Sequence, residues 1–147
     1  IARAFGAKVI YYSASGAPAQ EGYEQVDFET LLTQSDIISV HAPLNEHTEG
    51  LINSKAFEKM KSSCIFLNLG RGPIVDEQAL YNALVRNQIA AAGLDVLCEE
   101  PMSADNPLLK IKDSKRLLIT PHIAWASVEA RTHLMEIIHG QVKDFFA

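Results

Sequence analysis

A repeated pattern of a short apolar segment, a loop and an amphipathic segment constrains the fold of this chain more than any other feature. The apolar segments span residues 8–12, 36–40, 63–68, 90–96 and 116–120. They lack the polar alternation of a sheet with one exposed face, so we expect helices to cover both faces. Strands that alternate with helices predict an α/β fold with a doubly wound parallel sheet.

Polar residues mark where the helices begin. Asp27, Asn53, Asp76 and Ser127 each precede an amphipathic segment, and side chains of these types cap helix N-termini by accepting a backbone hydrogen bond. The four residues predict helices over 28–34, 54–60, 77–87 and from 127 to near the C-terminus.

The start of the chain indicates a fragment. Residues 1–6 contain no initiator Met and have the character of a closing helical turn, with Gly6 at the left-handed position that ends a helix. Because a domain rarely begins on the last turn of a helix, we expect this chain to be part of a longer protein.

Composition and spacing argue against several classes of partner. The 147 residues include 13 basic and 18 acidic side chains, a net charge of −5, whereas nucleic-acid binders carry a basic excess.

The chain has no apolar run long enough to predict a membrane span. Cys64 and Cys98 lack CxxC spacing and fit reduced thiols in a cytoplasmic protein. His133 and His139 are six residues apart, which excludes the usual i, i+4 metal pair, and no metal site is predicted.

The candidate site lies where the strands end, because ligands of such sheets bind beyond the carboxyl ends of the strands. Arg71 stands between two glycines after a predicted strand, and its guanidinium can bind a carboxylate through two parallel hydrogen bonds. His122, preceded by Pro121, can exchange a proton near neutral pH. Glu100 lies in a neighbouring loop, where its carboxylate can stabilise a protonated imidazole.

Each of these residues also has a purely structural interpretation. His122 can be a satisfied structural histidine, Arg71 a solvated loop charge, and Glu100 part of a solvated acidic turn. Asp95 ends a strand where a cofactor amide or ribose can lie, or it caps the following turn. The four residues gather at the same end of one predicted sheet, and this coincidence favours a functional site.

Several longer motifs follow one another along the chain. They are His41-Ala42-Pro43-Leu44 with Thr48 and Gly50, Asn68-Leu69-Gly70-Arg71-Gly72-Pro73-Ile74-Val75-Asp76, Gly93-Leu94-Asp95-Val96 with Glu99-Glu100-Pro101, Asn106-Pro107-Leu108, and Thr120-Pro121-His122-Ile123-Ala124. In order and spacing, and over nearly the whole chain, these motifs resemble the NAD-binding domain of the D-isomer-specific 2-hydroxyacid dehydrogenases. Within the family the sequence is most similar to the glycerate dehydrogenases, also called hydroxypyruvate reductases.

The resemblance implies a role for each site residue. Arg71 would bind the substrate carboxylate and polarise the keto oxygen, and His122 would be the acid and base, with Glu100 as its partner. Hydride would pass between C2 of the substrate and C4 of the nicotinamide. The implied NAD-binding residues are Ser13, Ala42, Pro43, Leu69, Gly70, Arg71, Asp95, His122 and Ala124.

Two departures from the family pattern qualify this assignment. Ser13 stands where NAD-specific folds usually place Asp or Glu, but no Lys or Arg lies between Tyr11 and Gln20 to hold a 2′-phosphate, so NAD is favoured over NADP. The first strand and the GxGxxG turn are missing. Residues 1–147 are therefore expected to be a partial Rossmann-like NAD-binding domain without its substrate domain, inactive in isolation, with apolar edges at strands 9–12 and 37–40.

The function implied for the complete protein is oxidation and reduction of a small D-2-hydroxy acid and its 2-keto acid, with D-glycerate and hydroxypyruvate as the pair. The family also suggests a homodimer. Two alternatives stay open: a dinucleotide-sensing protein similar to the corepressors built on this scaffold, and a dehydrogenase for another substrate such as phosphite.

Overall fold

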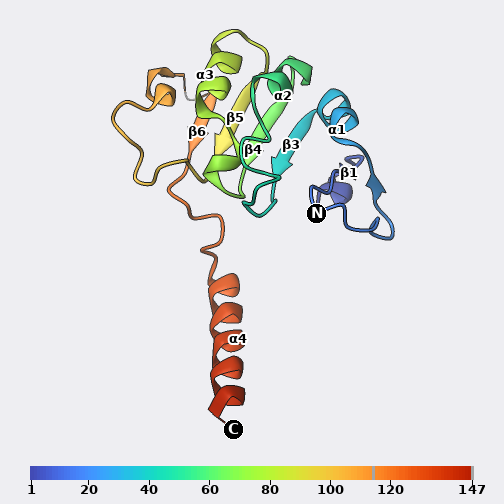
Figure 1. Ribbon diagram of the computed structural model, residues 1–147, viewed down its shortest axis with the longest axis vertical. Coiled ribbons are helices and arrows are strands. Elements are labelled where there is room, and N and C mark those ends of the chain that lie inside the picture. Colours follow the sequence, from blue (N-terminus) through green and yellow to red (C-terminus); the bar gives the residue numbers. More distant parts are fainter. Residues whose placement is uncertain (114, 147) are drawn as a thin grey trace.

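The computed structural model describes residues 1–113 and 115–146, and a four-stranded parallel sheet forms its centre (Figure 1). Val40, Asn68, Leu94 and Ile119 pair in one row across this sheet, so the carboxyl ends of all four strands meet at the same edge. The strands lie in the order β3 (Ile37–Val40), β4 (Ile65–Asn68), β5 (Ala91–Leu94) and β6 (Leu117–Ile119).

A second, smaller sheet holds the N-terminal part of the chain. It pairs β1 (Ile10–Tyr11) in parallel with β2 (Glu24–Gln25) and shares no strand with the main sheet. β1 is shorter than the predicted strand and only half-buried. β2 was not predicted because both of its residues are polar and exposed. The separation of β1 from β3 agrees with a doubly wound sheet that lacks the strand between them.

The helices begin where the capping residues predict. The side chains of Asp27, Asn53 and Asp76 accept backbone hydrogen bonds at the starts of α1 (Phe28–Gln34), α2 (Ser54–Lys59) and α3 (Glu77–Val85). α3 ends two residues before the predicted Asn87, which adopts a φ of 57° and cannot continue the helix. Short 3-10 turns complete the described chain: η1 (Ala2–Phe5), η2 (Gly72–Ile74) and η3 (Pro107–Lys110).

The core lies on one face of the main sheet. Ile38, Phe66 and Leu94 point from the strands toward α2 and α3, and Phe66 meets Phe57 edge-on with ring centroids 5.4 Å apart. The alternate residues face outward, and Ile37 and Leu118 are about 60% exposed. The prediction that both faces are covered is therefore wrong for the described residues, because their helices pack on one face only.

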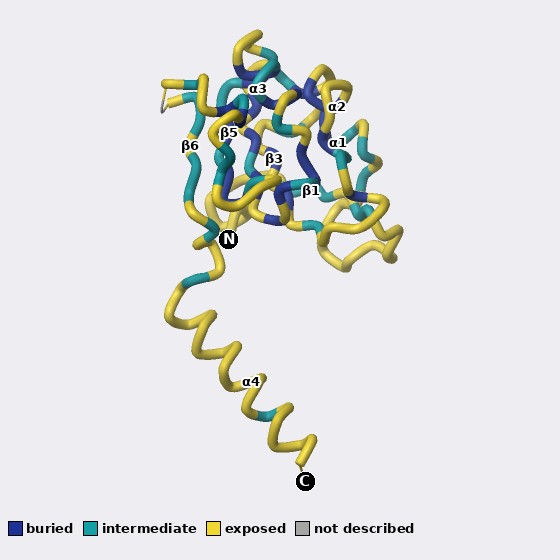
Figure 2. The backbone as a smooth tube through the Cα atoms, turned by 60° about the vertical axis from the view of Figure 1, so that its left-hand side comes forward, coloured by how far each residue is buried: buried dark blue, intermediate teal, exposed yellow. Residues whose placement is uncertain are grey.

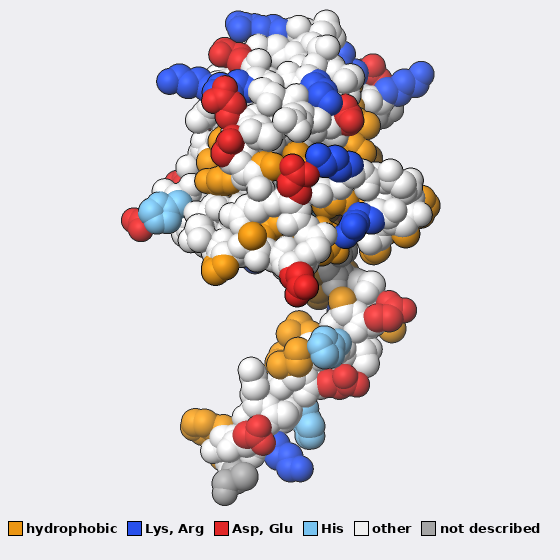
Figure 3. Space-filling model, turned by 90° about the vertical axis from the view of Figure 1, so that its right-hand side faces the viewer, with side chains coloured by type: hydrophobic (Ala, Val, Ile, Leu, Met, Phe, Trp, Pro, Cys, Tyr) orange, Lys and Arg blue, Asp and Glu red, His pale blue; other side chains and the backbone are white. Residues whose placement is uncertain are grey.

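α4 (Val128–Phe146) projects away from the sheet and buries none of its described residues (Figures 1 and 2). It begins as predicted, with the Ser127 hydroxyl accepting a hydrogen bond from Ala130 N at 3.1 Å. Figure 3 shows hydrophobic and histidine side chains exposed along this helix, and charges of both signs interspersed over the domain. Among the described residues, no helix combines the length and apolar character that a bilayer span requires.

Candidate active site

Four loops follow the strands of the main sheet and lie side by side at its carboxyl edge. They carry eight of the nine predicted NAD-binding residues together with Glu100, because neighbouring parallel strands end in one row. Ser13 is the exception: it follows β1 in the smaller sheet, where its hydroxyl lies 3.2 Å from that of Ser15. The structure thus gathers the three predicted catalytic residues in neighbouring loops.

His122 and Glu100 form a direct pair. The imidazole Nδ1 lies 2.8 Å from Glu100 Oε2, and both side chains are about 40% exposed. The other carboxylate oxygen accepts a hydrogen bond from Leu97 N at 2.9 Å. This backbone bond and the contact with His122 lower the pKa of Glu100, which is therefore ionised at neutral pH and accepts hydrogen bonds only. Nδ1 must then carry the proton, which leaves Nε2 free to exchange one with a substrate.

The loop that carries His122 is held by Asp95 at the end of β5. His122 has a φ of 55°, in the left-handed region that only a few per cent of non-glycine residues occupy and that His, Asn and Asp enter more often than the others. Asp95 is 3% exposed, and its carboxylate accepts hydrogen bonds from the Thr120 hydroxyl and from the backbone N–H groups of Ile123 and Ala124, at 2.6–2.9 Å. Because these donors lie both before and after His122 in the chain, the contacts oppose a change in its backbone conformation.

The same contacts bear on the two interpretations of Asp95. Burial acts to raise the pKa of Asp95, but the hydrogen bonds from Thr120, Ala124 and Ile123 outweigh it, so the pKa lies below its ordinary value. The carboxylate is ionised and both of its oxygens are engaged. Asp95 therefore caps the turn that follows β6, and contact with a cofactor remains a prediction.

Arg71 stands on a loop shaped by Asn68, the last residue of β4. The buried Asn68 amide donates to Arg71 O at 3.0 Å and accepts from Gly70 N at 3.1 Å. The guanidinium is exposed, and its Nη1 donates to Gly70 O at 2.8 Å. At Gly72 a Cβ atom would lie 1.9 Å from Leu97 O. The Arg71 loop therefore packs, backbone on backbone, against the loop that carries Glu100.

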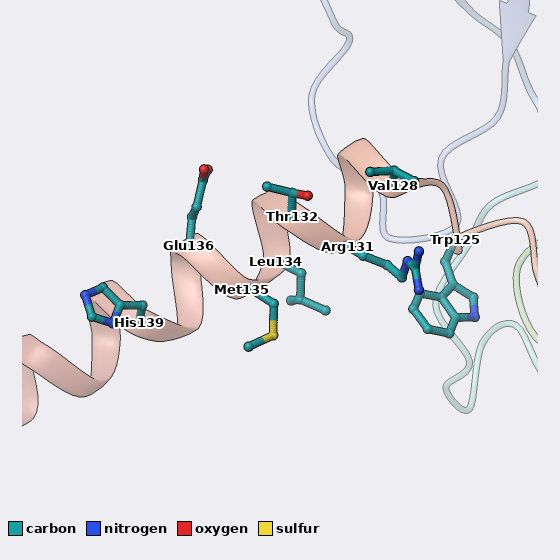
Figure 4. Close-up of a pocket in the computed structure, with 8 residues that line it drawn as sticks. All are labelled: Trp125, Val128, Arg131, Thr132, Leu134, Met135, Glu136 and His139. Carbon is teal, nitrogen blue, oxygen red and sulfur yellow. The ribbon is translucent and has the colours of Figure 1, made fainter.

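Two hollows lie near these loops. One, of about 500 Å³, is lined by residues 41–44 and 69–71, which include five of the predicted NAD-binding residues. The other, of about 770 Å³, runs along the first turns of α4, where Arg131 points toward Trp125 (Figure 4). None of the predicted site residues lines this second hollow. The chemistry assigned to Arg71, Glu100 and His122 belongs to the strand ends, so we place the candidate site there.

Residues that support the site were not assigned this role from the sequence. Asn68, Thr120 and Trp125 hold the Arg71 and His122 loops, the last by donating from its indole to His122 O at 2.8 Å. Asn68 and Asp95 carried a usable signal, since a polar residue that ends a buried strand must find a partner. The partner of Trp125 depends on how the chain turns after β6, which no spacing in the sequence specifies.

Comparison with known proteins agrees with this geometry. The family model described as D-isomer specific 2-hydroxyacid dehydrogenase, NAD binding domain, matches residues 1–124. The chain is 46% identical to a hydroxypyruvate reductase of Blautia hydrogenotrophica and 42% identical to a glycerate dehydrogenase of Methylorubrum extorquens; each alignment covers 99% of this chain and 45% of the relative. It is also 44% identical to a glyoxylate reductase of Thermococcus litoralis, over 93% of this chain and 41% of the relative.

Solved structures show the same fold. An acyclic imino acid reductase in complex with NADPH and D-Arg superposes with a TM-score of 0.88 at 37% identity, over 99% of this chain and 45% of that one. A D-lactate dehydrogenase from Aquifex aeolicus, complexed with NAD and lactic acid, superposes with a TM-score of 0.86 at 30% identity, over 98% and 47%. The chain thus spans less than half of each of these proteins. It belongs to the NAD-binding domains of the D-isomer specific 2-hydroxyacid dehydrogenase family.

Proposed function

We propose that this chain is the nucleotide-binding part of a longer, NAD-dependent enzyme that interconverts a D-2-hydroxy acid and its 2-keto acid, with D-glycerate and hydroxypyruvate as the pair. The observation that carries the proposal is the pairing of His122 with Glu100, whose side chains are 2.8 Å apart, together with the packing of the Glu100 loop against the loop that carries Arg71. The hydroxypyruvate reductase and glycerate dehydrogenase relatives support this choice of substrate, and the glyoxylate reductases support a small 2-keto acid more generally.

The residues present fit a nicotinamide cofactor. The hollow between the loops after β3 and β4 is lined by the small Ala42 and Gly70 and the apolar Pro43 and Leu69. At Gly70 a Cβ atom would come within 3.0 Å of Ala42 O, so the two loops that line the hollow approach each other closely at this glycine. These residues would hold the cofactor, with Ala124 beyond them. When bound, the nicotinamide would supply or accept the hydride that the protein itself lacks.

Arg71 would bind and orient the acid. Its guanidinium is exposed at the edge of the sheet, and Asn68 fixes the backbone from which it extends. A planar guanidinium binds a carboxylate through two parallel hydrogen bonds, which a lysine ammonium cannot do. This contact would set the position of the keto carbon relative to the cofactor, and it would place a positive charge near the oxygen that gains electron density.

His122 would move the proton. Because Glu100 accepts from Nδ1, the ring can give a proton from Nε2 to the keto oxygen during reduction and take it back during oxidation. The ionised Glu100 stabilises the charged imidazole that reduction requires. Asp95 accepts hydrogen bonds from the two residues after His122, and these bonds would hold the imidazole in place for this proton transfer.

Two substitutions in the longer protein test these roles. We expect Arg71→Lys to lower kcat/KM for hydroxypyruvate by about a hundredfold or more, since one charge cannot replace the two-pronged contact. We expect His122→Asn to abolish reduction while fluorescence titration shows NADH binding that is nearly unchanged. Near-normal turnover in either variant would remove that residue from the mechanism.

A panel of acids tests the substrate. Hydroxypyruvate, glyoxylate, pyruvate and phosphite, each assayed with NADH or NAD as its redox state requires, should rank with hydroxypyruvate highest in kcat/KM. Another 2-keto acid at the top of the ranking would correct the substrate and leave the reaction intact. Absence of turnover with every acid, together with tight NADH binding, would favour the dinucleotide-sensing alternative.

The choice of NAD over NADP rests on the surroundings of Ser13. The two basic residues nearest in sequence are engaged elsewhere: Arg3 donates to Gly22 O at 2.9 Å, and Lys8 pairs with Glu24 at 2.9 Å. Among the described residues, these two cations would therefore have to give up their partners to hold a 2′-phosphate beside Ser13. We expect the longer protein to bind NADH at least tenfold more tightly than NADPH, and equal dissociation constants would refute this preference.

We also propose that the complete enzyme is a cytoplasmic homodimer and that residues 1–147 alone are inactive. Cys64 is buried and Cys98 donates to Val75 O, so the two thiols are not paired with each other, as expected in a reducing compartment. Sedimentation of the longer protein would report the dimer. Residues 1–147 alone are expected neither to bind NAD tightly nor to turn over substrate, and micromolar NADH binding by them would refute this expectation.

A further inference from the structure

Glu77, in the first turn of α3, reaches into the loop that carries Glu100. Its Oε1 accepts a hydrogen bond from Cys98 N at 2.8 Å, and its Oε2 accepts one from the side-chain amide of Asn106 at 2.7 Å. Asn106 is itself 8% exposed, and its carbonyl oxygen accepts from Leu108 N at 2.9 Å. One carboxylate therefore joins the helix to two points of the segment between β5 and η3, Cys98 and Asn106.

The bonds continue from this point to the proposed acid and base. Cys98 follows Leu97, whose N–H donates to Glu100 at 2.9 Å, and Glu100 in turn pairs with His122 at 2.8 Å. We propose that Glu77 is a positioning residue, which holds the Glu100 loop so that its carboxylate faces the imidazole of His122. The expected effect of Glu77 on kcat rests on the proposed function, whereas its role in holding the Glu100 loop rests on the structure alone.

The chemistry of the site requires a carboxylate at Glu77. Both of its partners are donors, a backbone N–H and a side-chain amide, so an acceptor is needed at each oxygen. A glutamine there would turn a donor toward one of the two partners. Asn106 cannot compensate by flipping, because its carbonyl oxygen is already required by Leu108 N.

This arrangement allows a matched test in the longer protein. Glu77→Gln keeps the size of the side chain and breaks one of the two hydrogen bonds. The double variant Glu77→Gln, Asn106→Asp reverses the donor and acceptor between the two side chains, retains the net charge and restores both bonds. Glu29→Gln is the control, since Glu29 makes an exposed ion pair with Lys59 on the helices α1 and α2.

We expect Glu77→Gln to lower kcat for hydroxypyruvate by about ten- to a hundredfold, because a displacement near 1 Å at the reacting groups has effects of this size. KM and the dissociation constant for NADH should stay within about twofold, since Glu77 does not line the hollow proposed for the cofactor and both of its oxygens are engaged within the protein. The double variant should recover kcat to within about threefold of the wild type, and Glu29→Gln should resemble the wild type.

Hydrogen–deuterium exchange gives a readout that does not depend on turnover. Backbone amides in the peptide that covers residues 97–108 should exchange about tenfold faster in Glu77→Gln and return to the wild-type rate in the double variant. Unchanged exchange in Glu77→Gln, or a double variant no closer to the wild type than the single one, would overturn the inference. If the wild-type protein reduces no acid, the proposed function fails, and the exchange result still decides whether Glu77 holds the loop.

Discussion

The contact between Gly72 and Leu97 gives a direct test of whether the Arg71 and Glu100 loops act as one unit. A Cβ added at Gly72 would lie 1.9 Å from Leu97 O, 2.0 Å from Leu97 C and 2.4 Å from Cys98 N, all of them backbone atoms. Real Cβ contacts essentially never fall below 3.0 Å, so Gly72→Ala must separate the two loops by about 1 Å. A shift of that size at a reacting group corresponds to about a hundredfold in rate.

We therefore expect Gly72→Ala to lower kcat/KM for hydroxypyruvate by about a hundredfold in the longer protein. Overpacking of this kind also destabilises a fold by about 1–3 kcal/mol, which urea unfolding would measure. Two other glycines provide graded controls. At Gly93 a Cβ would meet only the flexible end of the Leu67 side chain at 2.9 Å, and at Gly140 in α4 nothing lies within 4 Å.

The three substitutions should therefore separate clearly. Gly140→Ala should leave kcat/KM unchanged and raise helix stability by up to about 1 kcal/mol, and Gly93→Ala should have a mild effect on both quantities. If Gly72→Ala kept kcat/KM within about threefold of the wild type, the backbone contact would not set the geometry of the site. The same substitution with low activity but unaltered stability would place the effect on ligand binding instead of packing.

Three further predictions concern single side chains. Asp95→Asn should lower the free energy of unfolding at neutral pH by about 1–3 kcal/mol, because an amide donor then faces backbone N–H groups. The native pKa of Asp95 lies below its ordinary 3.8, so the ionised carboxylate contributes this stability fully above a pH of about 4 and loses it as the pH falls through the native pKa. If the free energy of unfolding fell equally steeply with decreasing pH in wild type and variant, the prediction would be contradicted. Burial and the charge of Glu77 raise the pKa of Cys98 to about 11. Alkylation of the Cys98 thiol by iodoacetamide should therefore be slow at about pH 8 and accelerate toward pH 11, and a half-maximal rate near pH 9 would contradict this environment. Arg116 donates to Leu84 O and Ile89 O, and Arg116→Ala should cost about 2–3 kcal/mol in urea unfolding; a loss below about 0.5 kcal/mol would show that water replaces the guanidinium.

Much of the candidate site could be predicted from the sequence because its parts are local. Arg71 between two glycines and His122 after a proline each indicate a loop at a strand end, and parallel strands bring such loops to one edge. The family resemblance implied Glu100 as the partner of His122, and in the structure the two side chains lie 2.8 Å apart. Ser13 was placed in the same set by resemblance, yet it follows a strand of the smaller sheet.

The partners of the residues that support the site could not be predicted, since these contacts join distant segments. Glu77 and Asn106 are 29 residues apart, and Asp95 meets Ala124 across the same separation. No periodicity relates such positions, because the distance between them is set by how helices and loops pack. The prediction of a sheet covered on both faces was wrong for the described residues for a related reason. Apolar residues such as Ile37 and Leu118 show that a strand can pack against a helix, but they do not show whether a helix lies there to cover them.

The sequence by itself determined the α/β class, the starts of the helices and the candidate site residues, because each depends on neighbours along the chain. Hydrophobic runs, capping side chains and loop glycines act over a few residues, so their consequences can be predicted from order alone. Only the tertiary structure decided the state of those residues. It placed His122 at a φ of 55°, directed its Nδ1 to Glu100 and pressed Gly72 against Leu97, because these features arise where loops from different strands compete for the same space.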